Sequence, residues 1–162
     1  MSETLKVGMA DMKVCKAPDK LTTLGLGSCV GVCLYDPTTK VSGMVHVMLP
    51  DSTKIKNNSN IAKFADTGIK ATYDIMIKEG AKASKIVSKI AGGAAMFAVS
   101  SESGDIMKIG ERNVDATKKT LLKMGITILA EDTGLNYGRT IIFDSVTGEL
   151  TIKAVGREIK TV

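Results

Sequence analysis

Residues 29–48, CVGVCLYDPTTKVSGMVHVM, carry two strand-like stretches joined by a short polar segment. The stretches 29–35 and 41–48 are rich in valine and in other residues that favour strands. Between them, Asp36 and Pro37 occupy the first two positions of a turn, where type I turns favour aspartate and proline. We therefore predict that these residues form an antiparallel β-hairpin.

The length of the turn decides which residues of this hairpin lie opposite each other. If Pro37 and Thr38 are the two turn residues, Cys29 falls directly opposite His46. The β-carbons of such a pair are about 4.5–5.5 Å apart, which brings a thiol and an imidazole within hydrogen-bond reach. A type I turn matches the strand twist poorly in a two-residue loop, so a loop one residue longer is the alternative.

Two similar helix-to-strand units follow the hairpin. The predicted helices span about 61–79 and 110–124, and the strands after them span 85–91 and 126–132. Apolar residues fall on one stripe of each helix, and Gly80 and Gly125 lie where glycine commonly ends a helix. A second hairpin is predicted around Thr147 and Gly148, and one or two further strands are predicted within 6–16.

About eight strands and two to three helices in this order are typical of a mixed, mostly antiparallel α/β sandwich, with helices layered on a sheet. Polar loops are predicted over 51–60 and 98–108. A chain of 162 residues has the length of one domain with a hydrophobic core, so we predict a single domain over 1–162.

The charge pattern narrows the classes of partner. The net charge is +5, but the lysines are scattered along the chain rather than gathered with aromatic residues. This favours solvated helix faces or an acidic protein partner over nucleic acid. No stretch approaches the roughly 18 apolar residues of a membrane span, and the N-terminus lacks the apolar segment of a signal peptide. Three cysteines without a pairing pattern favour reduced thiols, so we predict a cytoplasmic protein that does not insert into a membrane.

The glycine-rich run 23–32, TLGLGSCVGV, is compatible with three kinds of site. A dinucleotide-binding loop would need a third glycine where Val30 stands, and it would need a helix rather than a strand to follow. A metal site would need Cys29 and Cys33 together, but residues four apart in a strand are separated by about 13 Å. Phosphate binding and metal binding are therefore disfavoured, and we assign no metal ligands.

A thiol nucleophile is the third possibility. His46 is the one histidine of the chain, so any cysteine–histidine chemistry must use it. A neighbouring imidazole raises the thiolate fraction of a cysteine such as Cys29. The alternative is that Cys29 is a core thiol and His46 a buried, hydrogen-bonded histidine. The residue pattern by itself leaves both interpretations open.

Five segments, TLGLGSCVGV, HVMLPDS, KIAGGAAMF, IGERN and AEDTGLNYGRT, together resemble the CheD family of chemoreceptor glutamine deamidases. They stand in the family's order and cover roughly 20–143. The resemblance implies a cytoplasmic enzyme of bacterial chemotaxis that hydrolyses glutamine side chains to glutamate on methyl-accepting chemotaxis receptors. It also implies a fold similar to the catalytic domain of the cytotoxic necrotizing factor deamidases.

The same resemblance assigns roles to individual residues. The nucleophile is the cysteine of GSC, Cys29, and the general base is the histidine of HVMLP, His46. The third member is the threonine six residues before the cysteine, Thr23, which would orient the imidazole ring. Backbone N–H groups of Cys29 and Ser28, beside the flexible Gly27, are the expected oxyanion donors. This mechanism needs no metal and no cofactor.

Two further functions and four residues stay open at this point. Some family members bind a CheC-type response-regulator phosphatase, and some remove methyl esters from receptor glutamates. A binding module or a methylesterase with the same site are therefore the alternatives to a deamidase. Asn113, Asn136, Met96 and Phe97 are compatible with turn or core roles and with contact to a substrate or partner.

Overall fold

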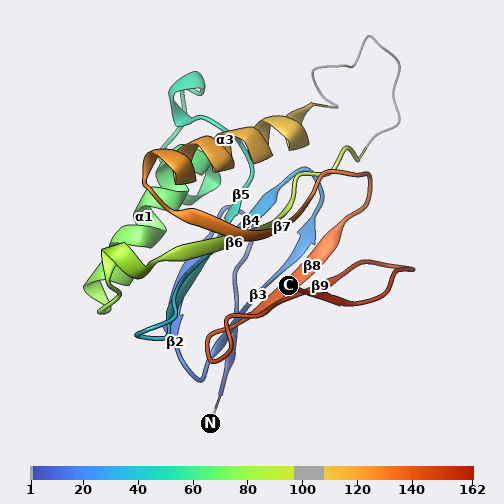
Figure 1. Ribbon diagram of the computed structural model, residues 1–162. Coiled ribbons are helices and arrows are strands. Elements are labelled where there is room, and N and C mark those ends of the chain that lie inside the picture. Colours follow the sequence, from blue (N-terminus) through green and yellow to red (C-terminus); the bar gives the residue numbers. More distant parts are fainter. Residues whose placement is uncertain (1, 97–107) are drawn as a thin grey trace.

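Two five-stranded β-sheets lie face to face, and two helices cover the outer face of one of them (Figure 1). The computed structural model describes residues 2–96 and 108–162. Sheet A contains, in spatial order, β1 (Thr4–Lys6), β3 (Lys20–Leu26), β8 (Arg139–Asp144), β9 (Leu150–Lys153) and β10 (Lys160–Thr161). Sheet B contains β2 (Met12–Lys16), β5 (Val41–Val47), β4 (Val30–Asp36), β6 (Val87–Gly92) and β7 (Thr127–Thr133).

Antiparallel pairing dominates both sheets. In the described part of the chain, the pairs β1–β3 and β6–β7 are parallel and the other strand pairs are antiparallel. This confirms the predicted mixed, mostly antiparallel α/β sandwich. None of the described helices combines the length and the apolar character that crossing a bilayer requires.

Strands β4 and β5 form the predicted hairpin, but the predicted register is wrong. His46 lies opposite Gly31 and not opposite Cys29, because the loop has the four residues 37–40 instead of two or three. The error is a register shift of two residues, and an even shift leaves the side chains on their predicted faces. Cys29 therefore stays on the same side of the sheet as His46, in a diagonal rather than a directly opposed position.

The side chain of Asp36 explains the longer loop. Its carboxylate accepts hydrogen bonds from the N–H of Thr38 (2.8 Å), from the Thr38 hydroxyl (2.6 Å) and from the N–H of Lys82 (2.7 Å). Lys40 closes the loop with a φ of 61° and donates its N–H to the Asp36 carbonyl at 2.8 Å. Local turn rules could not include Lys82, which lies 46 residues away in the sequence.

The two predicted helix-to-strand units are both present. Helix α1 (Ala65–Lys78) leads into β6, and helix α3 (Ile109–Lys123) leads into β7. Gly80 and Gly125 follow the helices with φ values of 104° and 73°, as glycine helix ends require. In both units the residue after the glycine donates its N–H to a carbonyl five residues back. The two units lie side by side because β6 and β7 pair in parallel.

The helix predicted over 61–79 is interrupted. Its first turn is a separate 3-10 helix, η2 (Ile61–Lys63), and α1 begins only after Phe64. Phe64 has extended backbone angles, φ −112° and ψ 142°, and forms a parallel bridge with Leu49. The tertiary contact with the chain after β5 therefore overrides the helical pattern at this point.

Strand β3 is a feature that the sequence analysis missed. Gly25 weakens the strand pattern, and a register shift in the pairing with β8 lies between Thr23 and Leu26. The predicted polar loop 51–60 contains the short 3-10 helix η1 (Ser52–Lys54), and η3 (Ala83–Lys85) precedes β6. The loop predicted over 98–108 lies, apart from residue 108, outside the described residues.

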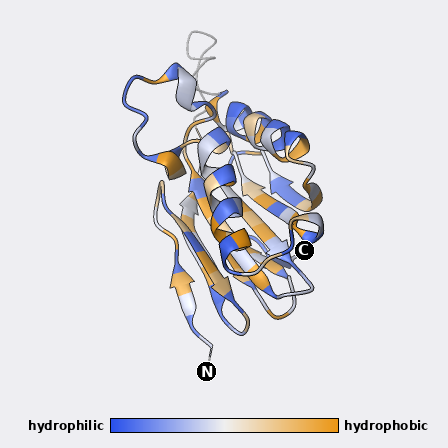
Figure 2. Cartoon of the chain, turned by 90° about the vertical axis from the view of Figure 1, so that its left-hand side faces the viewer, coloured by the Kyte–Doolittle hydropathy of each residue, from blue (hydrophilic) through white to orange (hydrophobic). Residues whose placement is uncertain are grey.

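Two apolar layers hold the sandwich together (Figure 2). The layer between the helices and sheet B includes Val30, Val32, Val45, Val47, Ile69 and Leu121. The layer between the two sheets includes Leu21, Leu26, Cys29, Cys33, Met44, Ile141 and Phe143. Strands β4 and β5 are covered on both faces, so each of their residues is buried. Side chains of this hairpin that face sheet A are therefore shielded from water.

Candidate active site

His46 and Thr23 meet across the space between the two sheets. His46 belongs to β5 of sheet B, and Thr23 belongs to β3 of sheet A. Nδ1 of His46 and Oγ1 of Thr23 are 2.7 Å apart, and both residues are fully buried. The predicted orienting threonine is thus in hydrogen-bond contact with the predicted base.

The second hydrogen bond of Thr23 decides which nitrogen of His46 carries the proton. The Thr23 hydroxyl donates to the backbone carbonyl of Val7 at 2.7 Å. A hydroxyl has one proton, and a carbonyl can only accept, so the Thr23 oxygen must accept from the imidazole. His46 is therefore protonated at Nδ1, and its Nε2 presents a lone pair. This is the tautomer that a general base requires.

Nε2 of His46 is buried and has no hydrogen-bond partner among the described residues. Burial also lowers the pKa of His46 below its ordinary value, because the charged imidazolium is poorly solvated there. The ring is consequently neutral near pH 7 and ready to accept a proton. An unpaired buried acceptor is costly in a core, which favours a chemical role for this atom over a structural one.

Cys29 lies in the bend that connects β3 to β4 and packs in the layer between the sheets. Its side chain belongs to the same layer that contains the imidazole of His46 and is only 8% exposed. Burial raises the pKa of the Cys29 thiol, so the sulfur is protonated at neutral pH. The resting pair is therefore a neutral thiol and a neutral imidazole.

Backbone hydrogen bonds fix the bend on both sides of Ser28. The Gly27 carbonyl accepts from the N–H of Ala94 at 2.9 Å, and the Cys29 carbonyl accepts from the N–H of Gly93 at 2.8 Å. Gly92, with a φ of 112°, allows this approach, because a β-carbon there would lie 2.3 Å from the Cys29 carbonyl oxygen. The segment after β6 thus holds the bend by backbone contacts alone.

The carbonyl of Ser28, between these two, is held by a side chain. Nδ2 of Asn113, on α3, donates to it at 2.9 Å. The C=O and N–H of one trans peptide group point in opposite directions. The Ser28 N–H therefore points away from Ala94, which binds the Gly27 carbonyl, and the Cys29 N–H points away from Asn113. Neither N–H has a partner among the described residues. They are two backbone donors without a partner in the described chain, at Cys29 and at the residue before it.

Other residues singled out in the sequence lie outside this arrangement. Cys33 is a packed core thiol, and Asn136 is exposed. Cys15 is buried, with hydrogen-bond contacts to serine hydroxyls rather than to His46. Met96 is 44% exposed and packs over Gly27, 3.0 Å from where a β-carbon would stand. Phe97 lies outside the described residues.

Reasoning from residue chemistry missed Val7 and did not assign Asn113. A backbone carbonyl such as that of Val7 carries no sequence signal, so its contact with Thr23 is visible only in the structure. The IGERN segment did mark the place of Asn113, but nothing in the sequence connected it to the bend before β4.

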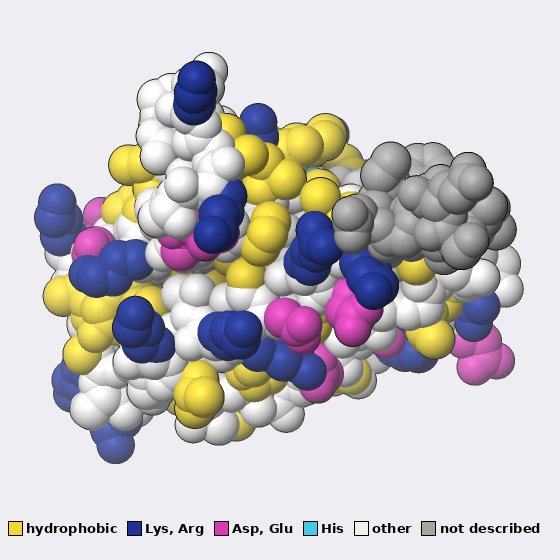
Figure 3. Space-filling model, turned by 90° about the horizontal axis from the view of Figure 1, so that it is seen from above, with side chains coloured by type: hydrophobic (Ala, Val, Ile, Leu, Met, Phe, Trp, Pro, Cys, Tyr) yellow, Lys and Arg dark blue, Asp and Glu magenta, His cyan; other side chains and the backbone are white. Residues whose placement is uncertain are grey.

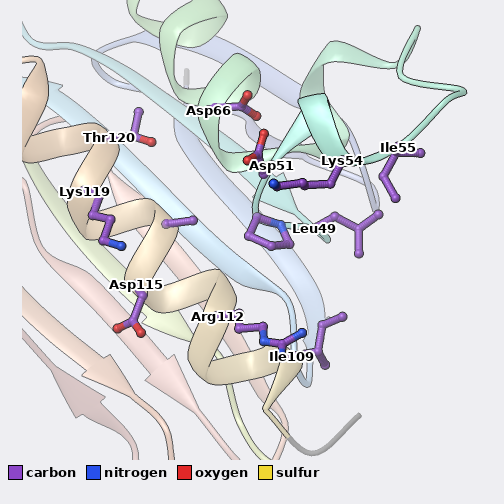
Figure 4. Close-up of a pocket in the computed structure, with 12 residues that line it drawn as sticks. Leu49, Asp51, Lys54, Ile55, Asp66, Ile109, Arg112, Asp115, Lys119 and Thr120 are labelled. Atoms are coloured by element: carbon purple, nitrogen blue, oxygen red, sulfur yellow. The ribbon is translucent and has the colours of Figure 1, made fainter. Parts of the chain in front are cut away.

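Charged side chains of both signs are interspersed on the face shown in Figure 3, and no histidine is visible on its described part. A groove of about 710 Å³ lies near the site, between the segment after β5 and helix α3 (Figure 4). Residues from both walls point toward it: Leu49, Asp51, Lys54, Ile55, Ile109, Arg112, Asp115 and Lys119. The described lining does not include the Cys29 thiol, so the groove is a neighbouring surface and not the reaction centre.

Comparison with known proteins identifies a family and full-length relatives. The family model described as CheD chemotactic sensory transduction matches residues 48–154. The probable chemoreceptor glutamine deamidase CheD of Lachnoclostridium phytofermentans is 64% identical over 162 residues, which is 100% of both chains. The chemoreceptor glutamine deamidase CheD of Bacillus licheniformis is 47% identical over 159 residues, 98% of this chain and 94% of that one.

Among solved structures, the hypothetical protein YfiH of Bacillus licheniformis aligns with a TM-score of 0.47 and 19% identity. The alignment covers 78% of this chain and 51% of that one. The family model and the full-length relatives decide the assignment: this chain belongs to the CheD family.

Proposed function

We propose that this protein is a cytoplasmic deamidase that hydrolyses glutamine side chains of chemoreceptors to glutamate, with Cys29 as nucleophile and His46 as base. The observation that carries the proposal is the fixed proton on Nδ1 of His46, which leaves a lone pair on Nε2. Membership of the CheD family and the names of its relatives support the substrate class.

The first half of the reaction is acyl transfer to the thiol. Nε2 of His46 takes the proton of Cys29 as the sulfur attacks the δ-carbonyl carbon of the substrate glutamine. Because burial raises the pKa of the thiol, proton removal accompanies attack and does not precede it. The carbonyl oxygen becomes an oxyanion, and the N–H groups of Ser28 and Cys29 bind it. The imidazolium then protonates the leaving nitrogen, so ammonia departs and a thioester remains.

The second half is hydrolysis of the thioester. His46, neutral again, removes a proton from a water molecule that attacks the acyl carbon. The same two N–H donors bind the second oxyanion. Collapse of this intermediate returns the proton to the Cys29 sulfur and releases glutamate. One water is consumed and one ammonia is formed for each side chain, and the scheme uses no metal or cofactor.

Mass spectrometry of receptor fragments tests the proposal. Cytoplasmic fragments of chemoreceptors are incubated with the protein, and glutamine-containing peptides are examined for a gain of about 1 Da. The gain must be lost in Cys29→Ala and in His46→Ala. Cys15→Ala, which removes another buried thiol outside the site, should retain activity. Retained turnover in Cys29→Ala would falsify the nucleophile assignment.

Two further measurements separate the alternatives that the family resemblance raises. A methylesterase would release methanol from methylated receptors through the same thioester, whereas a deamidase releases ammonia. A binding module for a CheC-type phosphatase would restore chemotaxis in a deletion strain even as the Cys29→Ala variant. The lone pair on Nε2 and the two free N–H donors favour catalysis, because binding alone requires neither.

A further inference from the structure

Asn113 is buried in α3 and donates two hydrogen bonds from a single amide group. Its Nδ2 is 2.9 Å from the Ser28 carbonyl oxygen and 2.9 Å from the Met48 carbonyl oxygen. The residue has no exposed surface. One amide nitrogen therefore joins the bend that carries the nucleophile to the end of the strand that carries the base.

The position of the first contact gives it a specific consequence. Ser28 and Cys29 share one peptide group, so holding the Ser28 carbonyl fixes the plane that contains the Cys29 N–H. That N–H points to the side opposite the amide of Asn113. Asn113 consequently aims an oxyanion donor without touching the substrate.

The second contact connects this donor to the general base. Met48 follows His46 by two residues, directly after β5. Because Nδ2 has two protons, it can serve both carbonyls at once, which no hydroxyl or carboxylate could do. The distance between the oxyanion donor and the imidazole is thereby set through one side chain.

Helix α3 is packed closely enough to transmit this constraint. A β-carbon on Gly110, one turn before Asn113, would lie 2.5 Å from the Ala94 carbonyl and 2.6 Å from the Gly93 carbonyl. Those two residues donate the N–H groups that hold the Cys29 and Gly27 carbonyls. All three anchors of the bend therefore rest on the first turns of α3.

We propose that Asn113 is a positioning residue for the oxyanion hole, acting through the Ser28–Cys29 peptide on the reaction proposed above. Its Oδ1 is buried and has no partner among the described residues, so the side chain is not optimised for stability. Its function is to hold the two carbonyls in one geometry while charge develops on the substrate oxygen.

The test uses Asn113→Asp, which has nearly the same size but cannot donate to both carbonyls, because a carboxyl group carries at most one proton. Loss of one oxyanion donor lowers kcat by about 100- to 1,000-fold, so its misalignment should lower kcat by about 10- to 100-fold. KM should change by less than about 3-fold, because the ground-state carbonyl uses these donors weakly. The rate of Cys29 alkylation by iodoacetamide should also stay within about 3-fold, because that reaction builds no oxyanion.

A transition-state mimic gives a readout that does not depend on turnover. A peptide with an aldehyde in place of the glutamine side-chain amide forms a tetrahedral adduct with a thiol. Its affinity for Asn113→Asp should fall by the same factor as kcat/KM. Equal losses in alkylation rate and kcat would instead indicate general disruption of the site and overturn the proposal, as would unchanged kcat.

Thr117→Val is the matched control. Thr117 lies one turn further along α3, is fully buried, and has a hydroxyl without a partner in the described chain. Its replacement by an isosteric apolar side chain should leave kcat and adduct affinity unchanged.

If Asn113→Asp does not fold, Asn113→Ser removes the double donor without adding a charge and is judged by the same readouts. An inactive wild-type protein would contradict the deamidase proposal itself, whereas an active wild type with an equally active variant contradicts only the role of Asn113.

Discussion

At the scale of single residues, a neutral hydroxyl contacts the imidazole that we propose as the base, where other thiol enzymes use a carboxylate or an amide. Thr23 can do so because its hydroxyl donates a hydrogen bond to the backbone carbonyl of Val7. Its oxygen is then left to accept a hydrogen bond from Nδ1 of His46. A hydroxyl stabilises an imidazolium less than a carboxylate does, so the ring remains a weak base. The hydrogen bonds from His46 to Thr23 and from Thr23 to Val7 determine which ring nitrogen accepts the proton. They do little to raise the basicity of that nitrogen.

Replacing Thr23 separates orientation from packing. Thr23→Val keeps the shape but removes the acceptor for Nδ1–H, so we expect kcat to fall by about 10- to 100-fold. Thr23→Ser retains a hydroxyl and should recover most of the activity. Steady-state deamidation of a receptor fragment measures both variants, and equal loss in the two would contradict a hydrogen-bonding role.

The acid limb of the pH–rate profile reports the imidazole. Catalysis needs unprotonated Nε2, and burial lowers the pKa of His46. The ordinary pKa of histidine is about 6.5. Activity should therefore persist below that pH and decline only as the pH falls through the lowered pKa of His46. A profile of kcat/KM against pH measures this limb. An inflection above the ordinary value would contradict the buried neutral ring.

At the scale of elements, the β4–β5 hairpin shows what sequence can and cannot specify. Strand-favouring residues correctly identified both strands, and the predicted pairing correctly placed Cys29 on the face that it shares with His46. The register was wrong because the turn depends on Asp36 binding Lys82, a contact that no local rule contains. Strand β3 was missed for a similar reason. Gly25 and Gly27, in and next to the bend before β4, weaken its strand pattern.

Asp36→Asn tests the anchor of this hairpin. Burial alone would raise the pKa of Asp36, but hydrogen bonds from Lys82, Thr38 and Thr39 outweigh it and hold the pKa well below its usual range. Because the carboxylate is favoured in the folded state, its stabilisation is complete above the unfolded pKa of about 3.9 and is lost as pH falls below it. Replacement should lower the free energy of unfolding by about 2–3 kcal/mol at pH 7.

Urea denaturation at several pH values measures this effect. The difference between wild type and Asp36→Asn should shrink as the pH is lowered below about 4. A difference that is independent of pH would show that packing, not the charge of Asp36, stabilises the hairpin.

At the scale of the whole molecule, the helix–glycine–strand repeat was the most reliable guide to the fold. The units that end at Gly80 and Gly125 were identified from sequence, and they lie side by side through parallel β6 and β7. The division into two sheets was not foreseen, because sheet A joins strands from both ends of the chain. The site depends on that division, since Thr23 and His46 come from different sheets.

A polar cluster joins the two sheets away from the reaction centre. Ser145, which follows β8, lies 3.2 Å from the Cys15 sulfur and 2.5 Å from the Ser42 hydroxyl. Ser145→Ala should lower the free energy of unfolding by about 1–2 kcal/mol, because buried hydrogen bonds are lost. Deamidation per folded molecule should be unchanged well below the melting temperature. A matching loss of activity would show that the cluster also positions the site.

The parallel pairing of β1 with β3 makes the first residues of the chain part of the acid–base chemistry. Without Val7, the Thr23 hydroxyl could rotate and donate to Nδ1 of His46, which would transfer the ring proton to Nε2. The imidazole would then face the thiol with a donor instead of a lone pair. A protein that lacks residues 1–7 should thus keep Thr23, His46 and Cys29 but carry the ring proton on the wrong nitrogen of His46. The nitrogen-15 chemical shifts of the ring would reveal this tautomer.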